Sequence, residues 1–159
     1  NLKQLEGLSR NHDLSNIFVS FNLRYLEQTN SLFQTDFHNC QDLEVKWLKN
    51  QISNNSWLLD KSLSGGGVLL DWGIHAIDLL HYLFDEELKF KSINFYEKEN
   101  NIDLSFELKL KCKEREISIQ MSWVERNNKI PFSIYFNNEK SQIVWKKNNS
   151  NLSIKKDNI

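Results

Sequence analysis

The stretch SGGGVLLDWGIHAIDLLHYLF, residues 64–84, decides how this chain folds. Successive glycines disfavour a helix, so a helix is predicted to begin just after them and to run over residues 68–84. At about 100° per residue, four polar side chains of this helix fall within about 60° of one another. They are Asp71, His75, Asp78 and Tyr82. Apolar residues occupy nearly all of the remaining circumference, which predicts a helix buried on most sides.

This polar stripe has three interpretations. Buried carboxylates and imidazoles are costly unless they are paired or used, so Asp71 one turn before His75 indicates a site facing a cleft. Alternatively, the two side chains only satisfy each other, because residues four apart are neighbours on a helix. A metal could also be held by Asp71, His75 and Asp78, but no cluster of cysteine and histidine completes a preferred zinc set, so no metal is predicted.

Gly73 lies inside the predicted helix, where glycine costs about 1 kcal/mol relative to alanine. A substrate, a cofactor or a neighbouring strand that approaches closely would explain the missing side chain, and so would simple packing against another backbone.

Residues 57–80 resemble the glucose-fructose oxidoreductase, inositol dehydrogenase and rhizopine catabolism (Gfo/Idh/MocA) family. The resemblance rests on Trp57, Asp60 and SGGGVLLDWGIHAIDLL at 64–80. In that family the pattern GGGxxxDxGxHxxD opens the long helix of the C-terminal domain. The resemblance implies NAD(P)-dependent oxidation of a sugar or cyclitol hydroxyl, or the reverse reduction. It implies that His75 is the catalytic acid/base and that Asp71 helps to position the substrate. Imidazole suits that role because it titrates near neutrality.

The same resemblance implies further site residues. Trp57 and Arg24 are expected to contact the substrate together with Asp71 and His75. The loop formed by Gly65, Gly66 and Gly67 is expected to lie near the nicotinamide of NAD or NADP.

The family's nucleotide-binding half is missing from this sequence. The five glycines contain no GxGxxG, and the single proline, Pro131, follows Ile130, so no Glu-Lys-Pro segment exists. Residues 1–25 are interpreted as the remnant of a Rossmann domain, with a helix over 2–14 and a strand over 17–21. Residues 26–159 are interpreted as a substrate-binding and dimerisation domain.

The expected function is therefore the C-terminal substrate domain of a sugar or cyclitol oxidoreductase. A missing Rossmann domain or a partner chain would bind most of the NAD or NADP, and this chain alone is expected to be inactive. The alternative is a non-catalytic binding or dimerisation module that keeps the fold.

Period-two alternation predicts the remaining structure. A short helix is expected over 26–35, and strands are expected near 43–48, 90–98, 102–110, 117–123, 132–136 and 141–147. Short connections predict an antiparallel meander. The resulting fold class is α+β, with a mostly antiparallel open-faced sheet covered on one face by the long helix.

The uncovered face of this sheet is expected to carry polar side chains: Ser105, Glu107, Lys109, Ser118, Gln120, Ser122 and Tyr135. The family resemblance implies a homodimer through this face. The absence of apolar residues there favours contact with water instead.

Composition excludes several classes of function. The chain has 159 residues, of which 40% are hydrophobic, which is enough for one sizeable core. A net charge of −1 offers no attraction to nucleic acid or to an anionic membrane. The two cysteines, Cys40 and Cys112, make no metal spacing. No segment resembles a signal peptide or a bilayer-spanning run, so a cytoplasmic location is expected.

Overall fold

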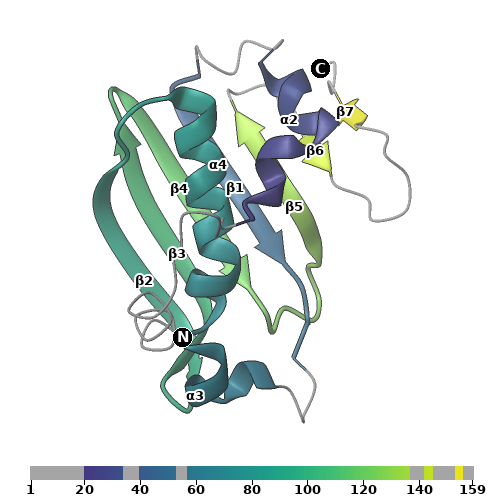
Figure 1. Ribbon diagram of the computed structural model, residues 1–159, viewed down its shortest axis with the longest axis vertical. Helices are drawn as coiled ribbons and strands as arrows, with labels where there is room; N and C mark the ends of the chain where they lie inside the picture. Colours follow the sequence, from purple (N-terminus) through teal and green to yellow (C-terminus); the bar gives the residue numbers. More distant parts are fainter. Residues whose placement is uncertain (1–19, 34–39, 53–56, 137–141, 145–152, 156–159) are drawn as a thin grey trace, which may run out of the picture.

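The computed structural model describes residues 20–33, 40–52, 57–136, 142–144 and 153–155. The predicted helix over 2–14 and most of the predicted strand over 17–21 lie outside the described residues. The described elements form an α+β fold, as predicted. A five-stranded, mostly antiparallel sheet is covered on one face by helix α4 (Ile74–Phe84) and the π-helical turn η4 (Leu69–Gly73) that precedes it (Figure 1).

Two tight hairpins build one half of the sheet. Strands β2 (Lys89–Glu99), β3 (Ile102–Cys112) and β4 (Arg115–Ser122) follow one another in antiparallel order. The turn between β2 and β3 consists of Asn100 and Asn101, whose φ values are 51° and 61°. Positive φ at both positions matches the twist of the flanking strands, and asparagine tolerates it better than most residues. The residues of this turn therefore explain why the two strands form a hairpin.

The other half of the sheet departs from the predicted meander. The strand order is β2-β3-β4-β1-β5, with β1 (Asp42–Leu48) parallel to β4 and antiparallel to β5 (Ile130–Phe136). The prediction of a simple meander was wrong here because the connection over residues 123–129 is long enough to pass β1, which lies between the consecutive strands β4 and β5. The insertion places apolar side chains of four strands in register across the sheet: Leu108, Ile119, Val45 and Ile134.

The remaining elements are short. They are η1 (Asn22–Tyr25), α2 (Glu27–Leu32), η3 (Trp57–Leu59), α3 (Lys61–Ser64), β6 (Gln142–Val144) and β7 (Ser153–Lys155). Strands β6 and β7 pair in a separate two-stranded sheet. Residues 20–33 lie beside α4, over the same face of the main sheet (Figure 1). Within the described ranges, none of the helices has the length and apolar composition that a bilayer crossing requires.

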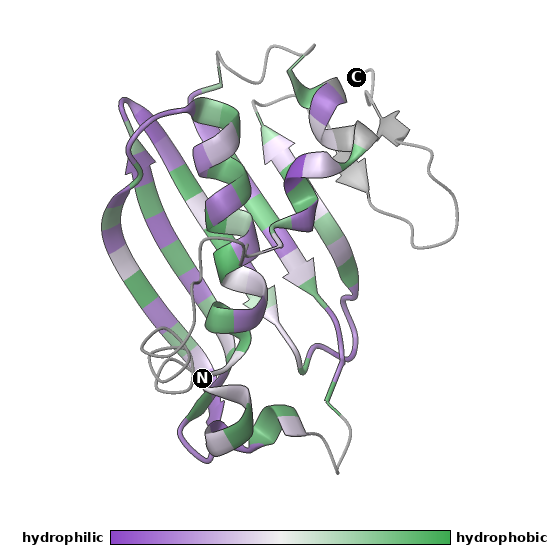
Figure 2. Ribbon diagram, viewed as in Figure 1, coloured by the Kyte–Doolittle hydropathy of each residue, from purple (hydrophilic) through white to green (hydrophobic). Residues whose placement is uncertain are grey.

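Hydropathy alternates along the strands, as Figure 2 shows. The apolar face packs under α4, whose inward residues are Ala76, Leu79, Leu80 and Leu83. The opposite face is less wet than predicted, because Ser105 and Ser122 face each other on β3 and β4 and are each only 6% exposed.

Glu107 organises the polar side chains of that opposite face. Its carboxylate accepts hydrogen bonds from Tyr96 Oη at 2.9 Å, Ser118 Oγ at 3.1 Å and Gln120 Nε2 at 3.4 Å. The bond from Tyr96 is the largest cause of a lowered pKa of Glu107. These four polar side chains therefore hydrogen-bond to one another within the face.

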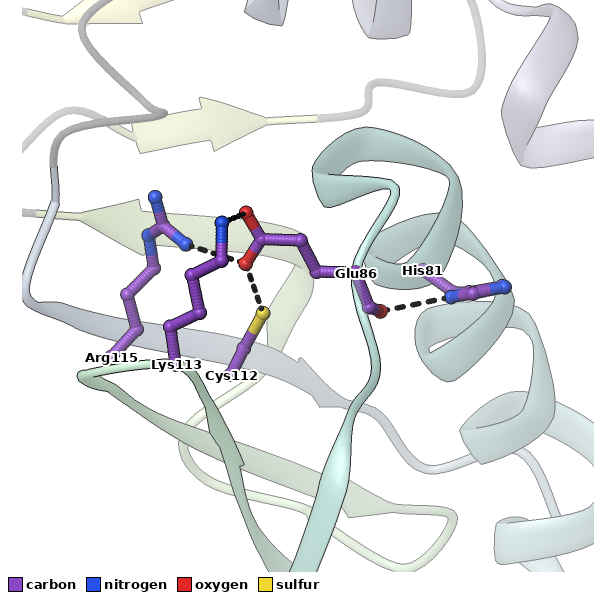
Figure 3. A network of polar contacts seen from close by, with 5 residues as sticks. All are labelled: His81, Glu86, Cys112, Lys113 and Arg115. Carbon is purple, nitrogen blue, oxygen red and sulfur yellow. Dashed lines mark hydrogen bonds and ion pairs between the residues drawn. The ribbon is translucent and has the colours of Figure 1, made fainter.

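Helix α4 ends in a latch to the sheet. Asp85 adopts the left-handed conformation with φ 50° and donates its N–H to the His81 carbonyl at 2.9 Å, so it takes the place of a terminal glycine. Glu86 follows and accepts hydrogen bonds from Cys112 Sγ at 3.2 Å, Lys113 Nζ at 2.5 Å and Arg115 Nη1 at 3.3 Å (Figure 3). These contacts, which we call the Glu86 latch, tie the helix end to the turn between β3 and β4.

Candidate functional site

The site begins in a π turn and not in the regular α-helix predicted from residue 68. The N–H of Ile74 donates to the Leu69 carbonyl, five residues earlier, so η4 is wider than an α-helical turn. Single π turns inside helices often occur at functional sites. Asp71 lies in this turn, and His75 lies in the first turn of α4.

Gly73 is explained by packing. A Cβ at Gly73 would lie 2.9 Å from Leu69 Cδ1 and 3.0 Å from Cζ of Phe106, which is buried on β3. A side chain at that position would have to displace the ends of Leu69 and Phe106, so glycine favours this close approach of the helix to the sheet. Of the explanations left open by the sequence, close approach of a strand is the one that the structure shows.

Tryptophans hold the π turn against the sheet. Trp72, between Asp71 and Gly73, is 4% exposed and stacks on Trp47 of β1 with 4.0 Å between ring centroids and 11° between planes. Trp123 meets the edge of Trp72 at 6.3 Å. Such aromatic contacts add to the free energy of burial. These contacts anchor Trp72 on the sheet. They therefore fix the orientation of the π turn about the helix axis, and with it the direction of the neighbouring Asp71.

The amino end of the helix is capped by a residue that the sequence analysis missed. Asp103 of β3 accepts hydrogen bonds from the backbone N–H of Gly67 at 3.2 Å and of Leu69 at 2.8 Å. A carboxylate at this position complements the helix dipole. No local signal in the sequence connects Asp103 to a helix that begins more than 30 residues before it.

The fold itself requires glycine at two positions of the glycine loop. A Cβ at Gly67 would lie 2.0 Å from the backbone oxygen of Asp103, so only glycine fits. Gly65 caps α3 in the left-handed conformation with φ 79°. The contact of Gly65, Gly66 and Gly67 with a nicotinamide stays a prediction.

Asp71 and His75 are half-buried on this helix and have unmet hydrogen-bonding capacity within the described residues. Asp71 is half-buried, and burial raises the pKa of its carboxyl group, although the nearby imidazole of His75 opposes that shift. No described residue donates a hydrogen bond to this carboxylate. In His75, which is also half-buried, Nδ1 is fully covered and has no hydrogen-bond partner among the described residues. Buried polar groups are normally satisfied, so these two side chains are the candidate site of this helix.

The rest of the polar stripe is engaged elsewhere. Asp78 forms a bidentate ion pair with Arg24, which lies 54 positions earlier in the sequence. Across the described part of the chain, no group of three or more histidine, cysteine or acidic side chains could hold a metal ion.

The two other predicted substrate contacts, Arg24 and Trp57, have different surroundings in the structure. Arg24 is bound to Asp78, and its role as a substrate contact stays a prediction. Trp57 is 60% exposed, and its indole makes no hydrogen bond or ring contact within the described residues. Its role also stays a prediction. Phe21, which the sequence analysis did not single out, meets the His75 ring edge-on with 5.9 Å between centroids.

Comparison with protein families agrees with this architecture. The family model described as the GFO/IDH/MocA C-terminal domain matches residues 33–142, which is more than half of the chain. The chain belongs to this family. A search of curated proteins finds no significant match.

Solved structures share the fold of this GFO/IDH/MocA C-terminal domain at low sequence identity. GenD2 from gentamicin A biosynthesis, solved in complex with NAD, is 13% identical with a TM-score of 0.62, over 77% of this chain and 37% of that one. The NAD-binding protein from Listeria innocua is 22% identical with a TM-score of 0.60, over 78% and 39%. The aldose-aldose oxidoreductase from Caulobacter crescentus, complexed with glycerol, is 14% identical with a TM-score of 0.59, over 70% and 36%. The chain therefore spans less than half the length of these proteins.

Proposed function

We propose that this chain is the substrate domain of an NAD(P)-dependent oxidoreductase that acts on a hydroxyl or carbonyl carbon of a sugar or cyclitol. The observation that carries the proposal is the pair of half-buried, unsatisfied groups on one helix face, the Asp71 carboxylate and the His75 imidazole. Support for the substrate class comes from the aldose-aldose oxidoreductase among the similar folds, and support for the cofactor comes from GenD2 and the Listeria innocua protein.

The chemistry needs a group that can take and return a proton. When an alcohol is oxidised, its C–H bond breaks and the electron pair leaves as hydride, while the O–H proton passes to a base and a carbonyl remains. His75 is that base, and it returns the proton when the reaction runs as a reduction. Asp71 accepts a hydrogen bond from the substrate hydroxyl or from the imidazolium that forms. A bound nicotinamide supplies the hydride acceptor or donor.

The described residues fit this proton transfer better than they fit dinucleotide phosphates. Phosphates commonly bind at a free helix amino terminus, but the one before α4 already holds the Asp103 carboxylate. This supports the proposal that residues outside this domain, in a Rossmann domain or a partner chain, hold most of the nucleotide.

The test is His75→Ala in the complete oxidoreductase that contains this chain, once sugars and inositols have been screened with NAD and NADP. Loss of a general base lowers turnover by about 10²- to 10⁴-fold, and cofactor affinity should not change. The matched control is His81→Ala, because His81 is an exposed histidine on the same helix whose Nδ1 lies 3.1 Å from the Glu86 carbonyl. Unchanged turnover in His75→Ala would remove the catalytic assignment and favour a non-catalytic binding or dimerisation module.

A homodimer through the uncovered sheet face is a separate proposal. The hydrogen bonds that Glu107 accepts within that face reduce the need for a partner. Sedimentation of wild type and Lys109→Glu distinguishes the alternatives, because Lys109 is exposed beside Glu107. A dimer that this substitution weakens supports the interface, and a monomer at all concentrations rejects it.

A further inference from the structure

The ion pair between Arg24 and Asp78 differs in geometry from the other ion pairs of the described chain. Arg24 Nε donates to Asp78 Oδ2 at 2.6 Å, and its Nη2 donates to Oδ1, so the planar guanidinium matches the carboxylate with two parallel bonds. The Asp78 side chain is only 9% exposed. A paired charge this well covered is costly to break, because the other charge is left buried.

Arg24 also lies between two aromatic rings. Its Cζ is 5.6 Å from the centroid of Phe21 and 5.3 Å from that of Tyr82, one turn beyond Asp78 on α4. Both distances fall within the range of cation–π attraction. The guanidinium therefore attaches residues 21–24 to the helix by two contacts, the ion pair with Asp78 and the ring of Tyr82, and it packs on Phe21 of its own segment.

This attachment reaches the candidate base. Phe21 meets the His75 ring edge-on, with 79° between the planes. Asp78 lies one turn after His75 on the same helix, so the two ends of the contact chain Asp78, Arg24, Phe21 and His75 are held by one rigid element.

We propose that Arg24 and Asp78 are positioning residues that hold Phe21 against the imidazole of His75, and that Arg24 is not a substrate ligand. Phe21 then limits rotation of the ring, which keeps Nδ1 covered and leaves Nε2 to exchange the proton. The proposal deepens the proposed function and rests on it for the catalytic meaning of His75. The contact chain itself can be tested without turnover.

The first experiment measures how fast diethyl pyrocarbonate modifies His75 in the folded chain, by peptide mapping. Arg24→Lys keeps the charge but loses the parallel bonds, and Phe21→Leu removes the ring. Each should raise the modification rate of His75 several-fold. The rate of His81 in the same digests should stay constant. Arg24 is substituted and not Asp78, because the Arg24 side chain is 32% exposed and the Asp78 side chain only 9%, so the fold is disturbed less.

A matched control breaks an ion pair elsewhere. Lys91→Ala removes the exposed contact of Lys91 Nζ with Glu116 Oε1 at 3.1 Å, and it should leave the His75 rate at the wild-type value. If Arg24→Lys and Phe21→Leu also leave that rate unchanged, the positioning role is refuted.

The second experiment separates positioning from substrate binding in the complete enzyme. Arg24→Lys should lower kcat and leave the substrate KM unchanged, whereas loss of a substrate ligand would raise KM and refute the proposal. The two hypotheses fail separately. If Arg24→Lys speeds modification of His75 but His75→Ala leaves turnover intact, the contact chain stands and the proposed function falls.

Discussion

At the scale of single residues, three half-buried aspartates belong to the helix and its cap. Two of them have hydrogen-bond partners among the described residues, and one has none. Asp78 has Arg24, and Asp103 has two backbone N–H groups. Asp71 has only the nearby charge of His75, and its raised pKa records the cost of burial. A group that costs stability and gains no bond within the fold is typical of a functional position.

This cost predicts opposite effects of Asp71→Asn on stability and on turnover. Removal of the charge should raise the urea midpoint at pH 7 and lower kcat of the complete enzyme by about 10²-fold. Because the pKa of Asp71 is raised, the folded state binds its proton more tightly than the unfolded chain does. The stability gain should therefore shrink as the pH falls toward the ordinary aspartate value of about 3.9. A lower midpoint at pH 7 would contradict this explanation.

The close contact at Gly67 makes a second prediction. Gly67→Ala should lower the free energy of unfolding by about 2 kcal/mol or more, because the new Cβ collides with the backbone of Asp103 and disturbs the helix cap. Gly66→Ala is the matched control. Its Cβ would meet the side chain of Leu70, which is 52% exposed and can move, so a smaller loss is expected. Equal losses in urea unfolding would show that close packing on Asp103 is not the reason for glycine.

At the scale of elements, α4 is held on the sheet at both ends by different means. At the amino end, the stacked rings of Trp47 and Trp72 and the Asp103 cap fix the π turn. At the carboxyl end, the Glu86 latch contacts the β3–β4 turn. The helix that carries His75 is therefore anchored on strands β1 and β3, and His75 lies between the two anchors.

The Glu86 latch predicts a pH dependence. Hydrogen bonds from Lys113 and then Cys112 lower the pKa of Glu86. The stability that the charged form contributes is complete above the ordinary glutamate value of about 4.3, and it is lost as the pH falls through the lower folded value. Glu86→Gln should therefore lower the urea midpoint at pH 7, and the difference from wild type should fade below about pH 4.

Glu87→Gln is the control for the latch, because Glu87 is 80% exposed and only approaches Lys89 at 3.9 Å. It should leave the midpoint unchanged at every pH. A Glu86→Gln deficit that persists undiminished at pH 3 would mean that the charge of Glu86 is not what stabilises the helix end.

At the scale of the whole molecule, the chain spans less than half the length of proteins that share its fold. The 159-residue chain alone should bind neither NAD(H) nor NADP(H) in calorimetry, because its α4 amino terminus is occupied by Asp103 and its glycines form no phosphate-binding turn. Saturable binding of either nucleotide by the isolated chain would contradict the proposal that residues outside this domain hold most of the nucleotide. The positive control is the complete oxidoreductase under the same conditions.

The sequence by itself determined most of the helices and strands and the spacing of the candidate site residues. Alternating apolar residues mark the strands, glycines mark the helix start, and the spacing of Asp71 and His75 places them one turn apart. These features are local, because each depends on backbone preference and on which side of one element meets water. The two-residue turn at Asn100 and Asn101 belongs to the same class.

Only the tertiary structure decided how distant segments meet. Insertion of β1 between β4 and β5, the Asp103 cap and the pairing of Arg24 with Asp78 each join residues more than 30 positions apart. The π turn depends on Trp47 and Phe106, which belong to other elements. Such contacts depend on packing and on the hydrogen bonding of buried polar groups across the whole fold. The periodic pattern of one segment therefore cannot predict them.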